Sequence, residues 1–271
     1  MCYEDNGKMS KVQVLVACIG QNDDKLYREM NLQTDTVLAN QCDQYGYKEF
    51  LEPDGSRVQL VSTTDHGVGK NRNKALSFAG GEFLLCADQD MVYCDDYARI
   101  IDEAFCQCPK ADIIVFRLEY MNRFTPQKKE RSGFRRVRLW NSMRYGTARV
   151  AMRKNAVEKA CLSFSTLYGG GARYSSGEDS LFIREAIRKG LRMYTSPTVI
   201  ARVKQEESTW FKGYNDKYFI DKGVLLANAF PCLKHLLLYY FAYGLRNVSE
   251  AYGFRRICKL IREGFAEYKR I

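Results

Sequence analysis

Short apolar runs alternate with segments of helical spacing through the first half of this 271-residue chain. The apolar runs are too short for helices and suit buried strands. Helical spacing covers residues 70–79, which end at Gly80-Gly81, and a stretch from Asp95 or Asp96 to about Gln107. The alternation predicts an α/β fold whose mostly parallel sheet is covered by helices. The predicted strands are residues 12–17, 36–40, 58–61, 83–87 and 113–116.

The second half is less regular. Residues 122–149 are basic and lack clean periodicity, so they predict a long loop with room for a hairpin. Residues 176–180 are predicted to open a helix that ends at Gly190, and an extended segment follows that stops at Ser196-Pro197. A further strand is predicted at residues 199–201.

Composition changes after about residue 204. We expect two domains, a catalytic domain of residues 1–204 and a helical, basic and aromatic extension of residues 205–271. Residues 236–243 are strongly apolar but too few to span a bilayer. Tyrosines beside cations at helical spacing suit a membrane interface, and the alternative is a helical subdomain packed on the sheet.

Two acidic residues, Asp88 and Asp90, follow the apolar run at residues 83–87. Because ligands of open α/β sheets bind at the carboxyl ends of strands, this pair is a candidate site. Two carboxylates this close repel each other unless a cation lies between them, and their hard oxygens suit Mg²⁺ or Mn²⁺. Such an ion would most simply hold a diphosphate, which indicates a nucleotide-linked substrate. A polar turn after a strand is the alternative.

Two other motifs could act with this pair. Arg72 follows a loop with two glycines, and its planar guanidinium suits a diphosphate or the acidic cluster itself. Glu178-Asp179 opens a predicted helix, where the helix dipole favours ionised carboxylates. An ionised carboxylate there could act as a general base, and simple N-capping is the alternative.

Charge and cysteine usage limit the function further. The chain has 42 Lys and Arg against 32 Asp and Glu, a formal net charge of +10, concentrated in residues 128–138 and 246–271. A basic surface suits a phosphorylated substrate, a polyanion or an acidic membrane, and no nucleic-acid-binding motif is present. Ten cysteines without C-x-x-C spacing argue against structural zinc. The polar start, with no apolar signal region, predicts a cytoplasmic protein with reduced thiols.

The order of these motifs resembles the family 2 glycosyltransferases, which have the GT-A fold. The matching features are the opening buried strand, Arg72-Asn73 at a helix, Asp88-Gln89-Asp90 after a strand and Glu178-Asp179 on a later helix. The resemblance covers residues 11–202. The tail, with residues 208–211 and 216–219, resembles bacterial members that build capsular or other surface polysaccharides.

The resemblance implies a role for each motif. Asp90 would bind Mn²⁺ or Mg²⁺ directly, and Asp88 would share the metal and contact the ribose. Arg72 would lie near the nucleotide and Asp43 against the uracil. Asp179 would be the catalytic base, with Glu178 as the second candidate. Such an enzyme inverts the anomeric carbon as it moves one sugar from a UDP-linked donor to a saccharide or lipid-linked saccharide. Its location would be the cytoplasm, with peripheral contact at the inner face of the plasma membrane.

Two features depart from the family pattern. Residues 17–22 replace the usual Pro-Thr/Ser-Tyr/Phe-Asn, and residues 201–204 lack the histidine that some relatives use as a metal ligand. Asp88-Gln89-Asp90-Met91-Val92 also fits the motif of haloacid-dehalogenase-type phosphatases, although those proteins place it on their first strand. A catalytically inactive membrane- or polymer-binding module of the same fold is the third hypothesis.

Overall fold

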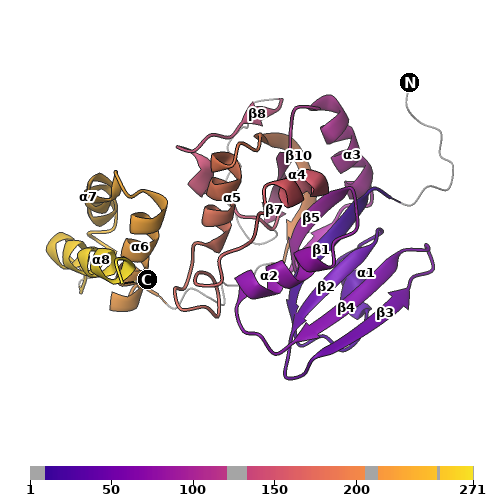
Figure 1. Ribbon diagram of the computed structural model, residues 1–271, viewed down its shortest axis with the longest axis horizontal. Coiled ribbons are helices and arrows are strands. Elements are labelled where there is room, and N and C mark those ends of the chain that lie inside the picture. The colour runs from indigo at the N-terminus through magenta and orange to yellow at the C-terminus, as the bar shows by residue number, and fades with distance from the viewer. Residues whose placement is uncertain (1–9, 121–132, 205–212, 249–250, 271) are drawn as a thin grey trace. The chain divides into compact units, whose positions relative to one another are not determined.

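A computed structural model describes residues 10–120, 133–204, 213–248 and 251–270 (Figure 1). The chain forms two compact units. The first comprises Met1–Thr166 and Glu178–Glu207, and the second comprises Leu167–Gly177 and Ser208–Ile271. The chain passes between the units three times, and the last passage, after Glu207, lies close to the expected boundary after residue 204. The segment Leu167–Gly177, however, belongs with the C-terminal helices, which the division into 1–204 and 205–271 did not foresee.

The first unit contains a ten-stranded sheet in the order β3-β4-β2-β1-β5-β9-β7-β10-β6, with β8 paired to β10. Its strands are β1 (Val12–Ile19), β2 (Thr36–Gln41), β3 (Gly46–Leu51), β4 (Arg57–Thr63), β5 (Phe83–Asp88), β6 (Met91–Tyr93), β7 (Ile113–Tyr120), β8 (Arg135–Arg136), β9 (Val150–Arg153) and β10 (Met193–Val203). Its helices are α1 (Lys25–Glu29), α2 (Val68–Ser77), α3 (Tyr97–Gln107), α4 (Lys154–Lys159) and α5 (Glu178–Arg188), with a 3₁₀ turn η1 (Ser142–Arg144).

The sheet confirms the five strands predicted in the first half. β4, β2, β1 and β5 are neighbours and pair in parallel. Among the described strands, however, five of the nine pairings are antiparallel, so the sheet is mixed. Strands β3, β6 and β9 were not predicted. β3 is an exposed edge strand without an apolar run, and β6 and β9 are only three and four residues long.

Strand β10 continues through Ser196-Pro197, where the sequence predicted an interruption. Its register with β7 shifts between Thr195 and Val199, and again between Val199 and Ala201. A bulge accommodates a proline in a strand because the ladder hydrogen bond is already absent there.

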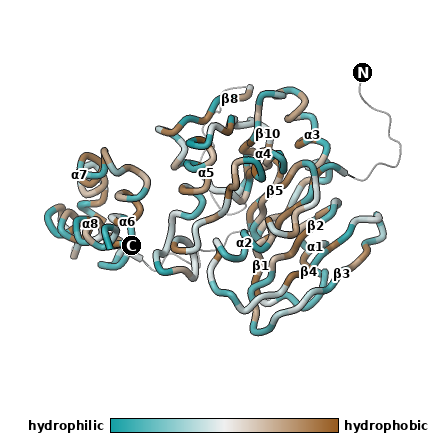
Figure 2. Tube along the Cα trace, in the orientation of Figure 1, coloured by the Kyte–Doolittle hydropathy of each residue, from teal (hydrophilic) through white to brown (hydrophobic). Residues whose placement is uncertain are grey.

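Both faces of the sheet are covered, which explains the unbroken apolar runs. Helices α1 and α3 pack on one face, where Leu26 and Phe105 join the core. Helices α2, α4 and α5 pack on the other face through Ala75, Val157 and Phe182. The central strands are accordingly among the most hydrophobic parts of the chain trace (Figure 2).

Parallel pairing places the carboxyl ends of β1, β2, β4 and β5 at one edge of the sheet. Helix α2 begins there, five residues after the end of β4, and Asp88 is the last residue of β5. This edge is where the topology of open α/β sheets places ligands.

The second unit contains three helices, α6 (Asp216–Ala229), α7 (Lys234–Gly244) and α8 (Phe254–Tyr268), around their own apolar core. Helices α6 and α8 cross at Gly223 and Gly264. A Cβ at Gly223 would lie 2.2 Å from the carbonyl oxygen of Ile261, and one at Gly264 would lie 2.1 Å from that of Ile220. The two glycines therefore allow the backbones to touch. In the described parts of the chain, no helix is both long enough and apolar enough to cross a membrane.

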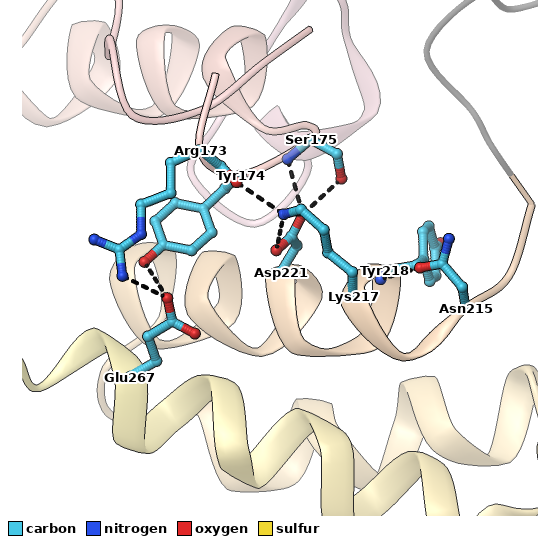
Figure 3. Close-up of polar contacts among 8 residues, drawn as sticks. All are labelled: Arg173, Tyr174, Ser175, Asn215, Lys217, Tyr218, Asp221 and Glu267. Atoms are coloured by element: carbon cyan, nitrogen blue, oxygen red, sulfur yellow. Dashed lines mark hydrogen bonds and ion pairs between the residues drawn. The ribbon is translucent and has the colours of Figure 1, made fainter. Parts of the chain in front are cut away.

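A polar network joins residues 173–175 to these helices (Figure 3). The Asp221 carboxylate, which is buried on α6, accepts hydrogen bonds from the backbone N–H and hydroxyl of Ser175 and from Lys217 at 2.8–2.9 Å. On α8, Glu267 accepts from the Tyr174 hydroxyl at 2.8 Å and from Arg173 at 2.9 Å. These contacts fix the segment before α5 to the C-terminal helices.

Candidate active site

Arg72 gathers the two acidic motifs around one guanidinium. Its Nη2 donates to Asp88 Oδ1 at 2.9 Å, and its Nη1 donates to Glu178 Oε1 at 3.3 Å and to Asp179 Oδ1. Asp88 ends β5, whereas Glu178 and Asp179 open α5 about ninety residues later. The structure therefore brings together four of the residues that the sequence singled out.

Arg72 is itself buried, with 6% of its surface exposed. Burial by itself would lower the pKa of the guanidinium, but the carboxylates of Asp179, Asp88 and Glu178 outweigh this effect and raise that pKa above its usual value. The Phe164 ring lies 5.4 Å from the guanidinium carbon and stacks on Phe182 of α5 at 4.0 Å. The arginine is thus fixed as a permanent cation among the acidic side chains.

Helix α2 is held in place by the segment that carries Phe164. Asn73 donates to the Phe164 carbonyl at 2.8 Å and accepts from the Phe164 N–H at 2.7 Å. A Cβ at Gly69 would lie only 2.1 Å from the Ser165 carbonyl oxygen, so a larger residue would displace this segment. Gly69 therefore has a packing function, and backbone approach to a ligand is not needed to explain it.

Asp179 is oriented through one of its two oxygens. Both Arg72 and the Thr147 hydroxyl donate to Oδ1. Oδ2 lies towards Gly146, where an added Cβ would come within 3.2 Å of it. A carboxylate held by one oxygen can accept a proton on the other, which is the arrangement a general base requires.

Asp88 and Asp90 lie on either side of the turn between β5 and β6. The pKa of Asp90 is raised because the carboxyl is partly buried and because Asp88 repels its negative charge. Gln89 accepts from the Ile19 N–H at 2.9 Å, which ties this turn to the end of β1. Two mutually repelling carboxylates on a fixed turn fit an Mn²⁺ or Mg²⁺ ion whose other ligands come from a diphosphate or water. Within the described ranges, no three His, Cys, Asp or Glu side chains are grouped closely enough to hold a metal alone.

Asp43 is exposed, two residues after the end of β2. Within the described residues, no hydrogen bond or ion pair joins its carboxylate to the Arg72 cluster. Gln41, at the end of the same strand, contacts the loop before α2 through His66 at 3.2 Å and the Gly67 N–H at 3.0 Å. The predicted role of Asp43 against a base stays a prediction.

Four residues near the site were not found from the sequence: Thr147, Gly146, Phe164 and Asn71. The first three lie in irregular segments, and they reach the site only through the fold. Asn71 donates to the Cys18 carbonyl at 3.1 Å and is buried, and its Oδ1 has no protein partner in the described structure. Of these four residues, only Asn71 could have been identified from the sequence, because it is next to Arg72.

Known proteins share this architecture. Residues 33–167 match the model of the family described as "Glycosyl transferase family 2", a segment that includes Arg72, Asp88 and Asp90. The structure resembles S. aureus TarS 1-349 in complex with UDP-GlcNAc, with a TM-score of 0.61 and 16% identity over 96% of this chain and 91% of that one. It also resembles TarS 1-349 in complex with UDP, with a TM-score of 0.59 and 18% identity over 90% of this chain and 74% of that one.

A longer S. aureus TarS chain matches with a TM-score of 0.59 and 17% identity over 90% of this chain and 45% of that one. None of the curated protein sequences matches this chain. At these identities the TarS structures establish the fold, and the family match establishes the type of enzyme. The chain contains a glycosyl transferase family 2 domain and has the GT-A fold.

Proposed function

We propose that this chain is an inverting glycosyltransferase that moves one sugar from a nucleoside diphosphate sugar, most simply UDP-linked, to a saccharide or lipid-linked saccharide during surface polysaccharide synthesis. The observation that carries the proposal is the Arg72 cluster. Its ion pairs join the Asp88-Gln89-Asp90 turn to the Glu178-Asp179 pair, which come from distant segments, and this supports a site at the edge where open α/β sheets bind ligands. Two TarS structures of the same fold contain UDP-GlcNAc and UDP, which supports a uridine donor.

Each group has a defined task in this reaction. Asp179, oriented by Arg72 and Thr147, accepts the proton of the acceptor hydroxyl as that oxygen attacks the anomeric carbon. The bond to the nucleoside diphosphate breaks on the opposite side, and the diphosphate leaves. Glu178 is the alternative base. Asp90 and Asp88 would hold Mn²⁺ or Mg²⁺, which supplies positive charge to the leaving diphosphate.

The donor can be identified without knowing the acceptor. A thermal-shift series would compare UDP, GDP and CDP and their sugars, each with and without Mn²⁺. A ligand that binds the native state raises the melting temperature by mass action. We expect Mn²⁺-dependent stabilisation by UDP, and its loss in Asp90→Ala. Asp179→Ala should keep this stabilisation and lose sugar transfer. Absence of any nucleotide effect in the wild-type protein would contradict the proposal.

Peripheral contact with an acidic membrane rests on α7, which is apolar on almost every side. Leu238 and Ala242 pack into the core of the second unit, yet the opposite face is also apolar and exposed. Leu236, Tyr240 and Tyr243 on that face are 68%, 72% and 62% exposed. A soluble surface helix normally has a polar outer face.

The charges beside this face indicate what covers it. Arg246 lies 3.8 Å from the centre of the Tyr243 ring, and Arg262 of α8 donates to the Tyr239 hydroxyl at 3.0 Å. Residues 233–270 contain eight Lys and Arg against three Glu and no Asp. Apolar and aromatic side chains bordered by cations suit the interface of an anionic bilayer.

The test is sedimentation of the full chain with phosphatidylglycerol-containing and pure phosphatidylcholine vesicles. We expect binding to the anionic vesicles and its loss in the double variant Leu236→Glu/Tyr240→Glu. The matched control is Leu51→Glu, since Leu51 is 78% exposed on β3 of the other unit. Equal sedimentation of the double variant and the wild-type protein would show that α7 does not bind lipid.

A further inference from the structure

Residues 133–149 form a basic segment whose arginines the proposed reaction leaves without a role. The segment contains five arginines and no acidic residue. Arg135, Arg138 and Arg144 are exposed. Arginines crowded into one short stretch that has no acidic residue of its own repel each other, so the surface favours an anionic partner.

An exposed tryptophan lies among these arginines. Trp140 is 77% exposed, and the Arg138 guanidinium lies 5.5 Å from the centre of its ring. A tryptophan this exposed leaves a large apolar ring face in contact with water, where it is available to a ligand. The ring can stack on the apolar face of a sugar, while the neighbouring guanidinium pairs with an anion.

The basic segment runs along helix α5 to the candidate base. Arg184 of α5 donates to the Leu139 carbonyl at 3.3 Å, and Thr147 at the other end donates to Asp179. Arg184 lies five positions after Asp179, which corresponds to about 7.5 Å along the helix axis. The segment therefore contacts α5 both at the carboxylate that would deprotonate the acceptor and, at Leu139 next to Trp140, through a side chain about one and a half turns further along the helix.

We infer that the acceptor of this enzyme is a phosphate-bearing saccharide, and that the basic segment binds it. Trp140 stacks on a sugar ring, and Arg138 and Arg144 pair with phosphate groups. The inference rests on the proposed glycosyl transfer and deepens it by assigning the class of acceptor. Planar guanidinium groups bind phosphate oxygens in a bidentate manner, whereas a neutral saccharide would gain little from the exposed cations of Arg135, Arg138 and Arg144.

In the test, the fluorescence of Trp140 itself reports ligand binding. The chain has two tryptophans, so Trp210→Phe leaves Trp140 as the only one. This protein is titrated with chemically phosphorylated dextran and with unmodified dextran of the same length, and Trp140 fluorescence is followed. We expect phosphodextran to bind at least tenfold more tightly than dextran, and to lose affinity as salt screens the charges. Equal binding of the two dextrans would overturn the inference.

The double variant Arg138→Gln/Arg144→Gln should weaken phosphodextran binding about tenfold. Its matched control is Arg255→Gln/Arg270→Gln, which removes two exposed arginines from the second unit. If the control lost the same affinity for phosphodextran, net charge alone would explain the effect, and this result would contradict the assigned surface. Displacement of phosphodextran by UDP alone would assign the arginines to the donor and also overturn the inference.

The same preparation separates this inference from the proposed function. Stabilisation of the wild-type protein by UDP and Mn²⁺ reports the donor site and needs no acceptor. If UDP stabilises the protein but phosphodextran binds no better than dextran, only the assignment of the acceptor fails. If UDP has no effect, the proposed function fails whatever the dextran titrations show.

Discussion

At the residue scale, Arg72 is the residue whose removal should disturb the candidate site most. One buried guanidinium faces three carboxylates, and removing it leaves them to repel each other. Breaking a buried ion pair by deleting one partner costs about 3–5 kcal/mol in other proteins. Because Asp88 is partly exposed, we expect Arg72→Ala to lower the free energy of unfolding by about 3 kcal/mol. Chemical denaturation measures the change.

The control for this variant lies on the same helix. Lys70 is exposed and pairs with Asp65 at 3.7 Å, and such surface pairs contribute little. Lys70→Ala should therefore change stability by less than about 0.5 kcal/mol. If the Arg72→Ala and Lys70→Ala variants were equally stable, the three carboxylates would not depend on the guanidinium.

Asp90 should be destabilising when no ligand is bound. Its pKa is raised by burial and by Asp88, so the native state binds the proton more tightly than the unfolded chain does. The native state is therefore favoured below the usual pKa of aspartate, and this advantage is lost as the pH rises through the raised value. At pH 7 we expect Asp90→Asn to raise the melting temperature by about 1–2 °C, and at pH 4 by less.

Two measurements check this explanation. Asp102→Asn on α3 removes a carboxylate that pairs with Lys11 at 3.6 Å, so it should not raise the melting temperature. With UDP and Mn²⁺ present, the order should reverse, because the wild-type protein gains stability from the ligand and Asp90→Asn does not. A ligand-free Asp90→Asn less stable than the wild type would refute the assigned repulsion.

At the element scale, the contact between α2 and residues 164–165 places Arg72. Gly69→Ala would push a methyl group against the Ser165 carbonyl oxygen, and overpacking of this kind costs about 1–3 kcal/mol. We expect lower stability together with weaker UDP binding, because Phe164 and Arg72 move with the displaced segment. Gly80→Ala is the control, since its Cβ would meet only the Gln13 side chain at 4.0 Å. Equal thermal stability of the two variants would exclude the close contact.

The elements that could be predicted from sequence are those with their own periodic signal. Strands β1, β2, β5 and β7 contain apolar runs that are buried on both faces, β4 contains the buried Val58, Leu60 and Val61, and α3 has a regular apolar stripe. Strand β3 is exposed along most of its length, so its residues carry no apolar run. The antiparallel pairing of β9 between β5 and β7 depends on contacts distant in sequence, which no local pattern records.

In the candidate site too, local sequence patterns identified some residues, whereas others are brought in only by contacts between distant segments. Asp88, Asp90, Glu178 and Asp179 were found because each pair adjoins a strand or helix boundary. The short chain segment around Thr147 gave no signal, since its position against Asp179 follows only from the path of residues 133–149 along α5. The sequence also suggested that Arg72 could neutralise the acidic cluster, and the structure confirms this interaction.

At the scale of the whole molecule, the second unit can be disrupted by a single methyl group. Gly264→Ala would place its Cβ against the backbone of α6, and α6 and α8 form most of that unit's core. We expect the variant to lose its binding to anionic vesicles, because α7 loses the core against which Leu238 and Ala242 pack. Gly253→Ala is the control, because nothing lies within 4 Å of its added Cβ.

The readout that makes this prediction specific is UDP binding, because every residue of the Arg72 cluster belongs to the first unit. Gly264→Ala should keep the Mn²⁺-dependent stabilisation by UDP while its vesicle binding and part of its helical circular dichroism are lost. Loss of UDP binding together with vesicle binding would show that the first unit does not fold without intact C-terminal helices. Retention of vesicle binding with normal helicity would contradict the close crossing of α6 and α8 at Gly223 and Gly264.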